Sequence, residues 1–288
     1  MLLYFDDEER FAQQLATATG LMPQRIVRHR FPDGEFKLTL PTGVTERAVL
    51  LRSLHHPNEK LVELMLAAQT ARALGARELV LVAPYLGYMR QDIAFHAGEA
   101  VSQTIVGKFL ADLFDAVIAV DPHLHRTGEL HAAVPAARAI AVATAPLLAQ
   151  FFSGKVDNPI LIGPDEEAEQ WVRAAAADRY QWTVCRKTRN GDRDVEVALP
   201  GIDIRGRDVV LIDDIASTGR TLAQTVYGLW AAGVANIDIF VTHPVFVGDA
   251  LDVLRAAGVG SIWSSDTVPH PTNAISVVPM LADALRQL

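Results

Sequence analysis

Cysteine is almost absent from this sequence, since Cys185 is the only one in 288 residues. A single thiol excludes a disulfide within the chain and a zinc site built from cysteines. Positive charge is also scarce: 26 lysines and arginines stand against 34 aspartates and glutamates, and the formal net charge is -8. A general nucleic-acid binder is normally basic, so this balance argues against nucleic acid as a partner, while it leaves room for a local cationic site.

Long apolar runs are missing as well. The most apolar stretch, residues 132–152, is interrupted by Pro135, Arg138 and Pro146, so we expect no membrane span. The first residues lack the basic region and the apolar core of a signal peptide, and we therefore expect a cytoplasmic protein. Half of the residues are apolar and 21% are charged, which is typical of a folded globular chain.

Two well-known phosphate-binding motifs, GxxxxGK[ST] and GxGxxG, do not occur. The stretch VVLIDDIASTGRT at residues 209–221 nevertheless has the features of a phosphate site. The apolar run 209–212 predicts a buried strand, and a helical pattern begins at Leu222. A strand that turns through small residues into a helix offers free N–H groups and the positive end of the helix dipole to an anion.

The turn in this stretch consists of Ser217, Thr218, Gly219, Arg220 and Thr221. Its glycine permits close approach of the backbone, and its hydroxyl groups are further donors. The preceding Asp213 and Asp214 suit sugar hydroxyls or a hydrated magnesium ion better than a phosphate. The stretch therefore predicts a sugar-phosphate site, and the alternative is a buried strand with a solvated Asp-Asp turn.

Apolar runs alternate with helical patterns along the whole chain. Strands are predicted at residues 2–5, 49–51, 79–82, 117–120, 159–162, 182–185, 209–212, 237–241 and 261–264. Helix caps are expected at Asp6-Asp7 and at Asn58. This alternation predicts an α/β protein with two similar doubly wound domains, residues 1–145 and 146–288, each with a parallel central sheet. In such sheets ligands bind at the carboxyl ends of the strands.

Further polar loops follow several of the predicted strands. The loop FPDGEF at 31–36 places an aromatic ring and two acids around a glycine, although Pro-Asp-Gly alone is ordinary turn chemistry. After the strand 79–82 comes PYLGYMRQD, in which tyrosine, glycine and Arg90-Gln91 suit an aromatic base and a polyphosphate. A solvated crossover loop is the alternative for this second segment.

Candidate metal ligands follow two other strands. His123 and His125 lie two residues apart and share a face if the strand 117–120 continues. They fit a zinc pair of a metal hydrolase, which needs further ligands, or histidines that are merely hydrogen-bonded. Asp165, after the strand 159–162, fits either a hard-metal ligand or a helix N-cap.

A basic segment, RKTR at 186–189, precedes the polar loop NGDRD at 190–194. Lys187 and Arg189 alternate, so they share one side of an extended segment. The loop beyond them has the composition of a closing lid, and an ordinary basic surface hairpin is the alternative.

Taken in order, these segments resemble the ribose-phosphate diphosphokinase family, also called phosphoribosyl diphosphate (PRPP) synthetases. The resemblance includes THPVF at 242–246 and SDTVPH at 265–270. It implies two type I phosphoribosyltransferase-like domains. It also implies transfer of the β,γ-diphosphoryl group of Mg-ATP to the anomeric hydroxyl of ribose 5-phosphate, which gives PRPP and AMP.

The resemblance also implies roles for individual residues. ATP is bound by Phe31, Asp33, Gly34, Glu35, Arg90 and Gln91, with the first loop coming from a neighbouring subunit, so a homo-oligomer with the ATP site at a subunit interface is implied. Mg²⁺ is bound by His123 and Asp165. Lys187 and Arg189 are the catalytic cations. Ribose 5-phosphate is bound by Arg189, Asp213, Asp214, Ser217, Thr218, Gly219, Arg220 and Thr221.

Three positions depart from the family pattern. Arg220 replaces a second glycine, although Thr-Gly-Arg-Thr also occurs in PRPP-binding relatives. Ile93 stands where the family usually has arginine or lysine, and Glu167 stands where it usually has glycine. A glutamate near a phosphate adds repulsion and prevents close backbone approach. The alternatives left open are a phosphoribosyltransferase that consumes PRPP and a catalytically weak regulatory relative.

Overall fold

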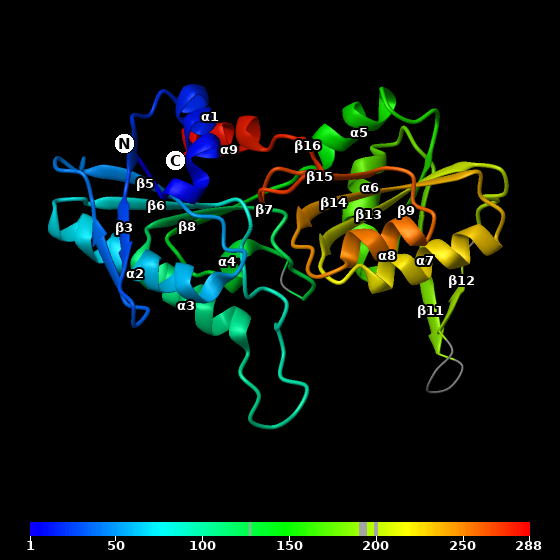
Figure 1. Ribbon diagram of the computed structural model, residues 1–288, viewed down its shortest axis with the longest axis horizontal. Coiled ribbons are helices and arrows are strands. Elements are labelled where there is room, and N and C mark those ends of the chain that lie inside the picture. The colour runs from blue at the N-terminus through cyan, green and yellow to red at the C-terminus, as the bar shows by residue number, and fades with distance from the viewer. Residues whose placement is uncertain (127, 190–194, 199–200) are drawn as a thin grey trace. The chain divides into compact units, whose positions relative to one another are not determined.

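The computed structural model describes residues 1–126, 128–189, 195–198 and 201–288 (Figure 1), with residues 187–189 and 195–198 described by their backbone alone. The chain forms two compact units, one made of Met1–Val142 with Val277–Leu288 and the other of Ala143–Ser276. No helix in these described ranges is long and apolar enough to cross a membrane.

The first unit is built on a six-stranded parallel sheet with the order β2-β1-β5-β6-β7-β8. Its strands are β1 (Leu2–Tyr4), β2 (Pro23–Arg25), β5 (Arg47–Leu51), β6 (Glu78–Ala83), β7 (Ala116–Val120) and β8 (Arg138–Val142). Its helices are the 3₁₀ helix η1 (Asp6–Glu8), α1 (Glu9–Thr19), α2 (Pro57–Ala73), α3 (Ser102–Leu113), α4 (Leu130–Ala133) and α9 (Val278–Arg286). Helices α1 and α9 cover one face of the sheet and α2, α3 and α4 the other (Figure 1).

Both faces of this sheet are buried, and successive side chains of a strand enter different cores. Leu2 and Tyr4 pack in the core under α1 and α9, whereas Leu3 and Phe5 pack in the core under α2 and α3. Parallel sheets covered on both faces need continuous apolar strands, and this requirement explains the runs seen in the sequence.

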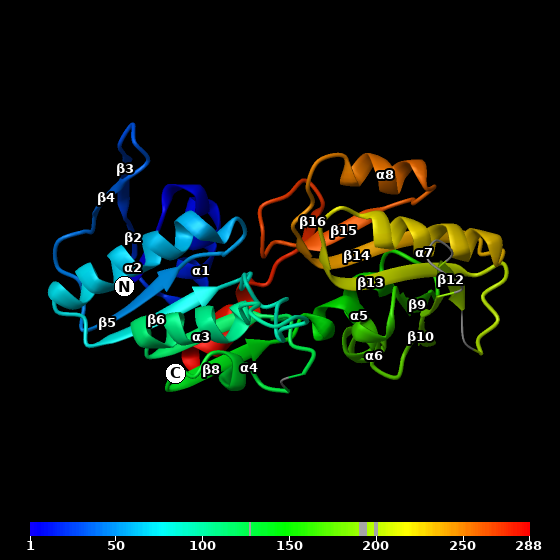
Figure 2. The same ribbon diagram turned by 90° about the horizontal axis from the view of Figure 1, so that it is seen from below.

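The second unit repeats this plan with the parallel order β10-β9-β13-β14-β15-β16. Its strands are β9 (Ile160–Gly163), β10 (Trp182–Val184), β13 (Asp208–Ala216), β14 (Asn236–Pro244), β15 (Ile262–Ser265) and β16 (Asn273–Ile275). Its helices are α5 (Ala145–Ser153), η2 (Glu166–Ala168), α6 (Glu169–Ala176), α7 (Arg220–Ala231) and α8 (Ala250–Ala256). Helices α7 and α8 lie on one face and α5 and α6 on the other (Figure 2). The prediction of doubly wound α/β architecture is confirmed.

Helix α9 belongs to the first unit, although the expected second domain ran to residue 288. Its apolar side chains Leu281 and Leu285 are buried in the core that α1 also covers. Arg286 donates a hydrogen bond to the carbonyl of Ala18 at 2.7 Å, and Arg138 donates one to the carbonyl of Leu288 at 2.6 Å. The second unit therefore ends at Ser276.

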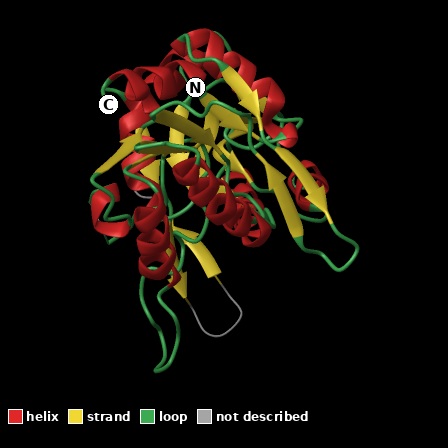
Figure 3. Cartoon of the chain, turned by 90° about the vertical axis from the view of Figure 1, so that its left-hand side faces the viewer, coloured by secondary structure: helices red, strands yellow, loops and turns green. Residues whose placement is uncertain are grey.

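Each unit carries an antiparallel hairpin after the second strand of its sheet. The first hairpin joins β3 (Val27–Arg30) to β4 (Phe36–Thr39), and the second joins β11 (Arg186–Arg189) to β12 (Val195–Ala198). Among the described residues, neither hairpin is hydrogen-bonded into a six-stranded sheet. Figures 2 and 3 show the first hairpin standing away from the sheet of its unit.

Two expected helix caps are wrong. The side chains of Asp6 and Asp7 make no capping hydrogen bond and instead pair with arginines. Helix α2 begins at Pro57 with His56 as its N-cap, and the carboxamide oxygen of Asn58 accepts a hydrogen bond from the hydroxyl of Tyr88.

Helix α3 packs closely against α4 at Gly107, where an ideal Cβ would lie 1.8 Å from the carbonyl oxygen of Ala133. In an open helix, replacing glycine by alanine stabilises by up to about 1 kcal/mol. We expect Gly107→Ala instead to lower the free energy of unfolding by about 1–3 kcal/mol, because the two helices must move apart. Urea unfolding measures this change. Gly128→Ala is the control, since a Cβ there meets nothing within 4 Å. Equal stability of both variants would contradict this packing.

Candidate functional site

Strand β13 runs four residues past its predicted end at 212 and stops at Ala216. Backbone pairing with β14 continues to Ala216, which lies opposite Pro244. Asp213 and Asp214 therefore lie inside the strand, and Asp214 is only 3% exposed. The alternative of a solvated Asp-Asp turn is wrong.

Acids crowd the carboxyl edge of this sheet. Burial raises the pKa of Asp213 well above its ordinary value, and the negative charges of Asp214 and Asp165 raise it further. These carboxylates follow or end the neighbouring strands β9 and β13. Acids gathered in this way repel one another, and a cation or hydrogen-bond donors would stabilise their ionised forms.

The turn after β13 leads directly into α7. Gly219 is the N-cap residue with φ +70°, and a Cβ there would lie 3.1 Å from the carbonyl oxygen of Ala250. The N–H of Val247 donates a hydrogen bond to the carbonyl of Ser217 at 3.1 Å and so fixes the turn from outside. Helix α7 begins at Arg220, two residues before the predicted start at Leu222.

Polar side chains around this turn are accessible to solvent. Thr218, Arg220 and Thr221 are exposed, and Ser217 is half-buried. The first turn of a helix has unpaired N–H groups and a partial positive charge. Exposed hydroxyls beside such a helix end suit a phosphate, and Gly219 occupies a left-handed backbone position that favours glycine.

Asp165 occupies the N-cap position of η2 but makes no capping hydrogen bond. The expected cap position is therefore confirmed, without the side-chain hydrogen bond of a cap. Its neighbour Glu166 pairs with Arg186, at the base of the second hairpin, at 3.3 Å. Glu167 is exposed on the same turn.

In the first unit, the tip of the first hairpin is a tight turn. The N–H of Phe31 donates to the carbonyl of Glu35 at 2.8 Å, and the N–H of Gly34 donates to the carbonyl of Phe31 at 2.9 Å. Gly34 has φ +97°, and the N–H of Glu35 donates to Asp33 Oδ1 at 3.2 Å. The side chains of Phe31, Asp33 and Glu35 are consequently presented to solvent.

The loop after β6 carries an exposed Arg90, while the amide of Gln91 donates to the carbonyl of Ile93 at 2.8 Å. Asp92 accepts two hydrogen bonds from Arg126, at 2.7 and 2.8 Å. Arg126 ties this loop to the one after β7. Arg126 was not predicted from the sequence. Its position directly after the His-x-His pair was the one feature that could have indicated it.

His123 and His125 lie side by side after β7, although the strand ends at Val120 and does not continue to them as the prediction required. Their Nε2 atoms are 2.5 Å apart and their rings meet edge to face with centroids 3.9 Å apart. Among the residues that the structure describes, no group of three or more His, Cys, Asp or Glu side chains is placed to hold a metal ion. Within those residues, the zinc-hydrolase alternative lacks its further ligands.

The predicted site residues divide between the units. Phe31, Asp33, Gly34, Glu35, Arg90, Gln91 and His123 belong to the first unit, and Asp165, Asp213, Asp214 and residues 217–221 belong to the second. Lys187 and Arg189 are at alternate positions of β11, opposite Val197 and Val195. Their side chains and the expected lid at 190–194 lie outside the described residues.

Comparison with known proteins finds two family domains along the chain, the second of which begins within the first unit. Residues 1–116 match the N-terminal domain of ribose phosphate pyrophosphokinase, and residues 127–251 match the phosphoribosyl transferase domain. The ribose-phosphate pyrophosphokinase of Halobacterium salinarum is 34% identical over 99% of this chain and 100% of its own length. That of Methanopyrus kandleri is 34% identical over 91% and 90%.

A solved structure matches along nearly the whole chain. The phosphoribosylpyrophosphate synthetase from Mycobacterium smegmatis superposes with a TM-score of 0.88 and covers 99% of this chain and 97% of its own, at 22% identity. That likeness establishes the fold. The identity of 34% to two ribose-phosphate pyrophosphokinases, along 90% or more of their lengths, establishes the family. The chain belongs to the ribose-phosphate pyrophosphokinase family.

Proposed function

We propose that this enzyme converts ATP and ribose 5-phosphate into PRPP and AMP. The observation that carries the proposal is the strand, turn and helix from Asp208 to Ala231, found in a chain that matches ribose-phosphate pyrophosphokinases along its whole length. The anomeric oxygen forms a bond to the β-phosphorus, the bond between that phosphorus and the α-phosphate oxygen breaks, and the hydroxyl proton is released.

Ribose 5-phosphate is assigned to the second unit. Its phosphate fits the N–H groups and hydroxyls at residues 217–221, where Gly219 allows close approach. Asp213 and Asp214 then accept hydrogen bonds from the ring hydroxyls, which orients the anomeric oxygen. Because a phosphoryl transfer depends mainly on alignment and charge neutralisation, this orientation is the principal contribution of the turn.

ATP is assigned to the first unit. Phe31, Asp33, Gly34 and Glu35 hold its adenosine part, and Arg90 with Gln91 holds its phosphates. The exposure of the hairpin tip supports a homo-oligomer, a dimer or larger, in which this tip serves the ATP site of a neighbouring subunit. Lys187 and Arg189 stabilise the charge that develops on the transferring group.

Mg²⁺ is the proposed cofactor, with His123 and Asp165 as its protein ligands. The raised pKa of Asp213 beside Asp165 supports a cation requirement at the acid-lined edge. The ion, when bound, neutralises charge on the donor phosphates.

Product analysis tests the function directly. We expect AMP to form from ATP and ribose 5-phosphate in equimolar amounts with PRPP. Release of pyrophosphate from PRPP plus a nucleobase, without AMP formation, would identify a phosphoribosyltransferase instead. Absence of turnover in an intact oligomer would identify a regulatory relative.

Replacement of Lys187 by alanine removes a proposed transition-state cation. We expect the turnover number to fall roughly 100- to 1000-fold, because a preorganised charge in a dry site has few substitutes. Circular dichroism should be unchanged, and the rate is read from AMP release. A near-normal rate would show that Lys187 has no catalytic role.

Gly219→Ala tests the phosphate turn. The added methyl group meets the carbonyl of Ala250 on a left-handed backbone, so we expect the KM for ribose 5-phosphate to rise at least about 10-fold, about 1.4 kcal/mol. The KM for ATP should change little. Gly206→Ala is the matched control, since it has φ +69° but no neighbour within 4 Å. If both substitutions raise the KM for ribose 5-phosphate equally, backbone strain alone explains the effect.

Chelation tests the metal. EDTA should stop AMP formation, and added Mg²⁺ should restore it. His123→Ala should raise the Mg²⁺ concentration for half-maximal rate by about 10-fold, the loss expected for one ligand contact worth about 1.4 kcal/mol. His131→Ala, an exposed histidine of the same unit, is the control. An unchanged requirement in His123→Ala would remove that residue from the ligand set.

A further inference from the structure

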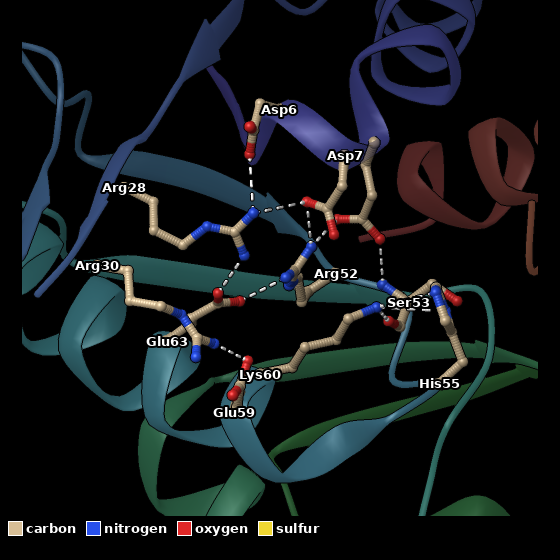
Figure 4. A network of polar contacts seen from close by, with 11 residues as sticks. Asp6, Asp7, Arg28, Arg30, Arg52, Ser53, His55, Glu59, Lys60 and Glu63 are labelled. Carbon is tan, nitrogen blue, oxygen red and sulfur yellow. Dashed lines mark hydrogen bonds and ion pairs between the residues drawn. The ribbon is translucent and has the colours of Figure 1, made fainter. Parts of the chain in front are cut away.

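A buried ion network lies at the base of the first hairpin (Figure 4). Its centre is Arg52, which follows β5 and is 1% exposed. Its guanidinium donates to Asp7 at 2.7 Å, to Glu8 at 3.2 Å and to Glu63 at 2.5 Å. The network thus joins η1, the end of β5 and helix α2.

The first hairpin is attached to this network through β3. Arg28 pairs with the other oxygen of Glu63 and donates to Asp6 at 3.0 Å. Arg30, two residues on, pairs with Glu59. Residues two apart share a face of a strand, and residues four apart share a face of a helix. The arginine face of β3 therefore matches an acidic face of α2.

The other face of β3 carries His29, which contacts Phe31 just beyond the end of the strand. His29 and Phe31 meet edge to face with ring centroids 4.7 Å apart, and Phe31 is 38% exposed. Backbone ladder bonds of this hairpin run only between β3 and β4. The buried Ile26 before β3 and Leu40 after β4 anchor the hairpin in the core, and the N–H of Ile26 donates to the carbonyl of Tyr4 at 2.8 Å. The ion pairs of Arg28 and Arg30 attach β3 itself to α2, and β3 ends at Arg30, next to Phe31.

We propose that Arg28 and Arg30 are positioning residues for ATP. They contact no reacting atom; they fix β3 against α2 so that the hairpin tip is held ready for the adenosine part of ATP. This inference rests on the proposed function, in which Phe31 and its neighbours bind ATP. A hairpin without these pairs must be ordered when ATP binds, and that cost appears as weaker ATP binding.

Arg28 is a better residue to test than Arg52. Removing Arg52 leaves Glu8 and Glu63 as buried carboxylates without their main partner, which destabilises the fold itself. The side chain of Arg28 is 25% exposed at the rim of the network. Arg30 pairs with Glu59 at the surface, so its replacement cannot expose a buried charge.

The experiment measures KM for both substrates, turnover number and melting temperature for Arg28→Gln and Arg30→Gln. We expect the KM for ATP to rise about 10-fold in the first variant, about 1.4 kcal/mol, and in the same direction but less in the second. Turnover and the KM for ribose 5-phosphate should stay within about twofold. Arg28→Lys, which keeps the charge but not the fork, should recover part of the loss.

Two further variants make the result decisive. Arg77→Gln removes an exposed ion pair with Glu46 in the same unit and should leave every constant unchanged. Phe31→Ala tests the underlying function and should itself raise the KM for ATP. In the Phe31→Ala background, Arg28→Gln should add little, because positioning matters only when there is a ring to position.

The outcomes separate the two ideas. An effect of Phe31→Ala without any effect of Arg28→Gln or Arg30→Gln overturns the positioning role and leaves the proposed function standing. No effect of Phe31→Ala overturns the assignment of the hairpin tip to ATP. Equal rises in both KM values, with a lowered melting temperature, would reduce Arg28 to a structural residue.

Discussion

Burial of parallel strands on both faces is the constraint on which this structure depends. Such strands accept almost only apolar side chains between their ends, so charged residues collect where the strands stop. In the first unit these are the acids after β1 and Arg52 after β5. In the second unit they are Asp165 after β9 and the acids at the end of β13. Charged side chains of the sheets are therefore found at the ends of the strands.

The same topology gives opposite electrostatic results in the two units. In the first, Arg52 meets the acids from the neighbouring strand, and the rim is neutralised from within the chain. In the second, acids follow both strands, and their mutual repulsion raises the pKa of Asp213. A ligand that brings hydroxyls or a cation would relieve this repulsion.

Local sequence was sufficient for part of this picture. Apolar runs predicted β6, β7 and β14 to within a few residues, and the small residues at 217–221 predicted the turn, because both signals are local. The length of β13 could not be predicted, since it depends on pairing with β14. Asp6 and Asp7 looked like a helix cap, but Arg28 and Arg52, distant in sequence, compete for their oxygens. Partners separated by long loops leave no local pattern.

Helix α9 has a consequence for the order in which the chain matures. The first unit is interrupted in sequence, and its core includes Leu281 and Leu285. The second unit is continuous from Ala143 to Ser276. During synthesis the ribosome therefore translates every residue of the second unit before it translates α9, which completes the core of the first unit. The part of the protein translated first is the last to be completed.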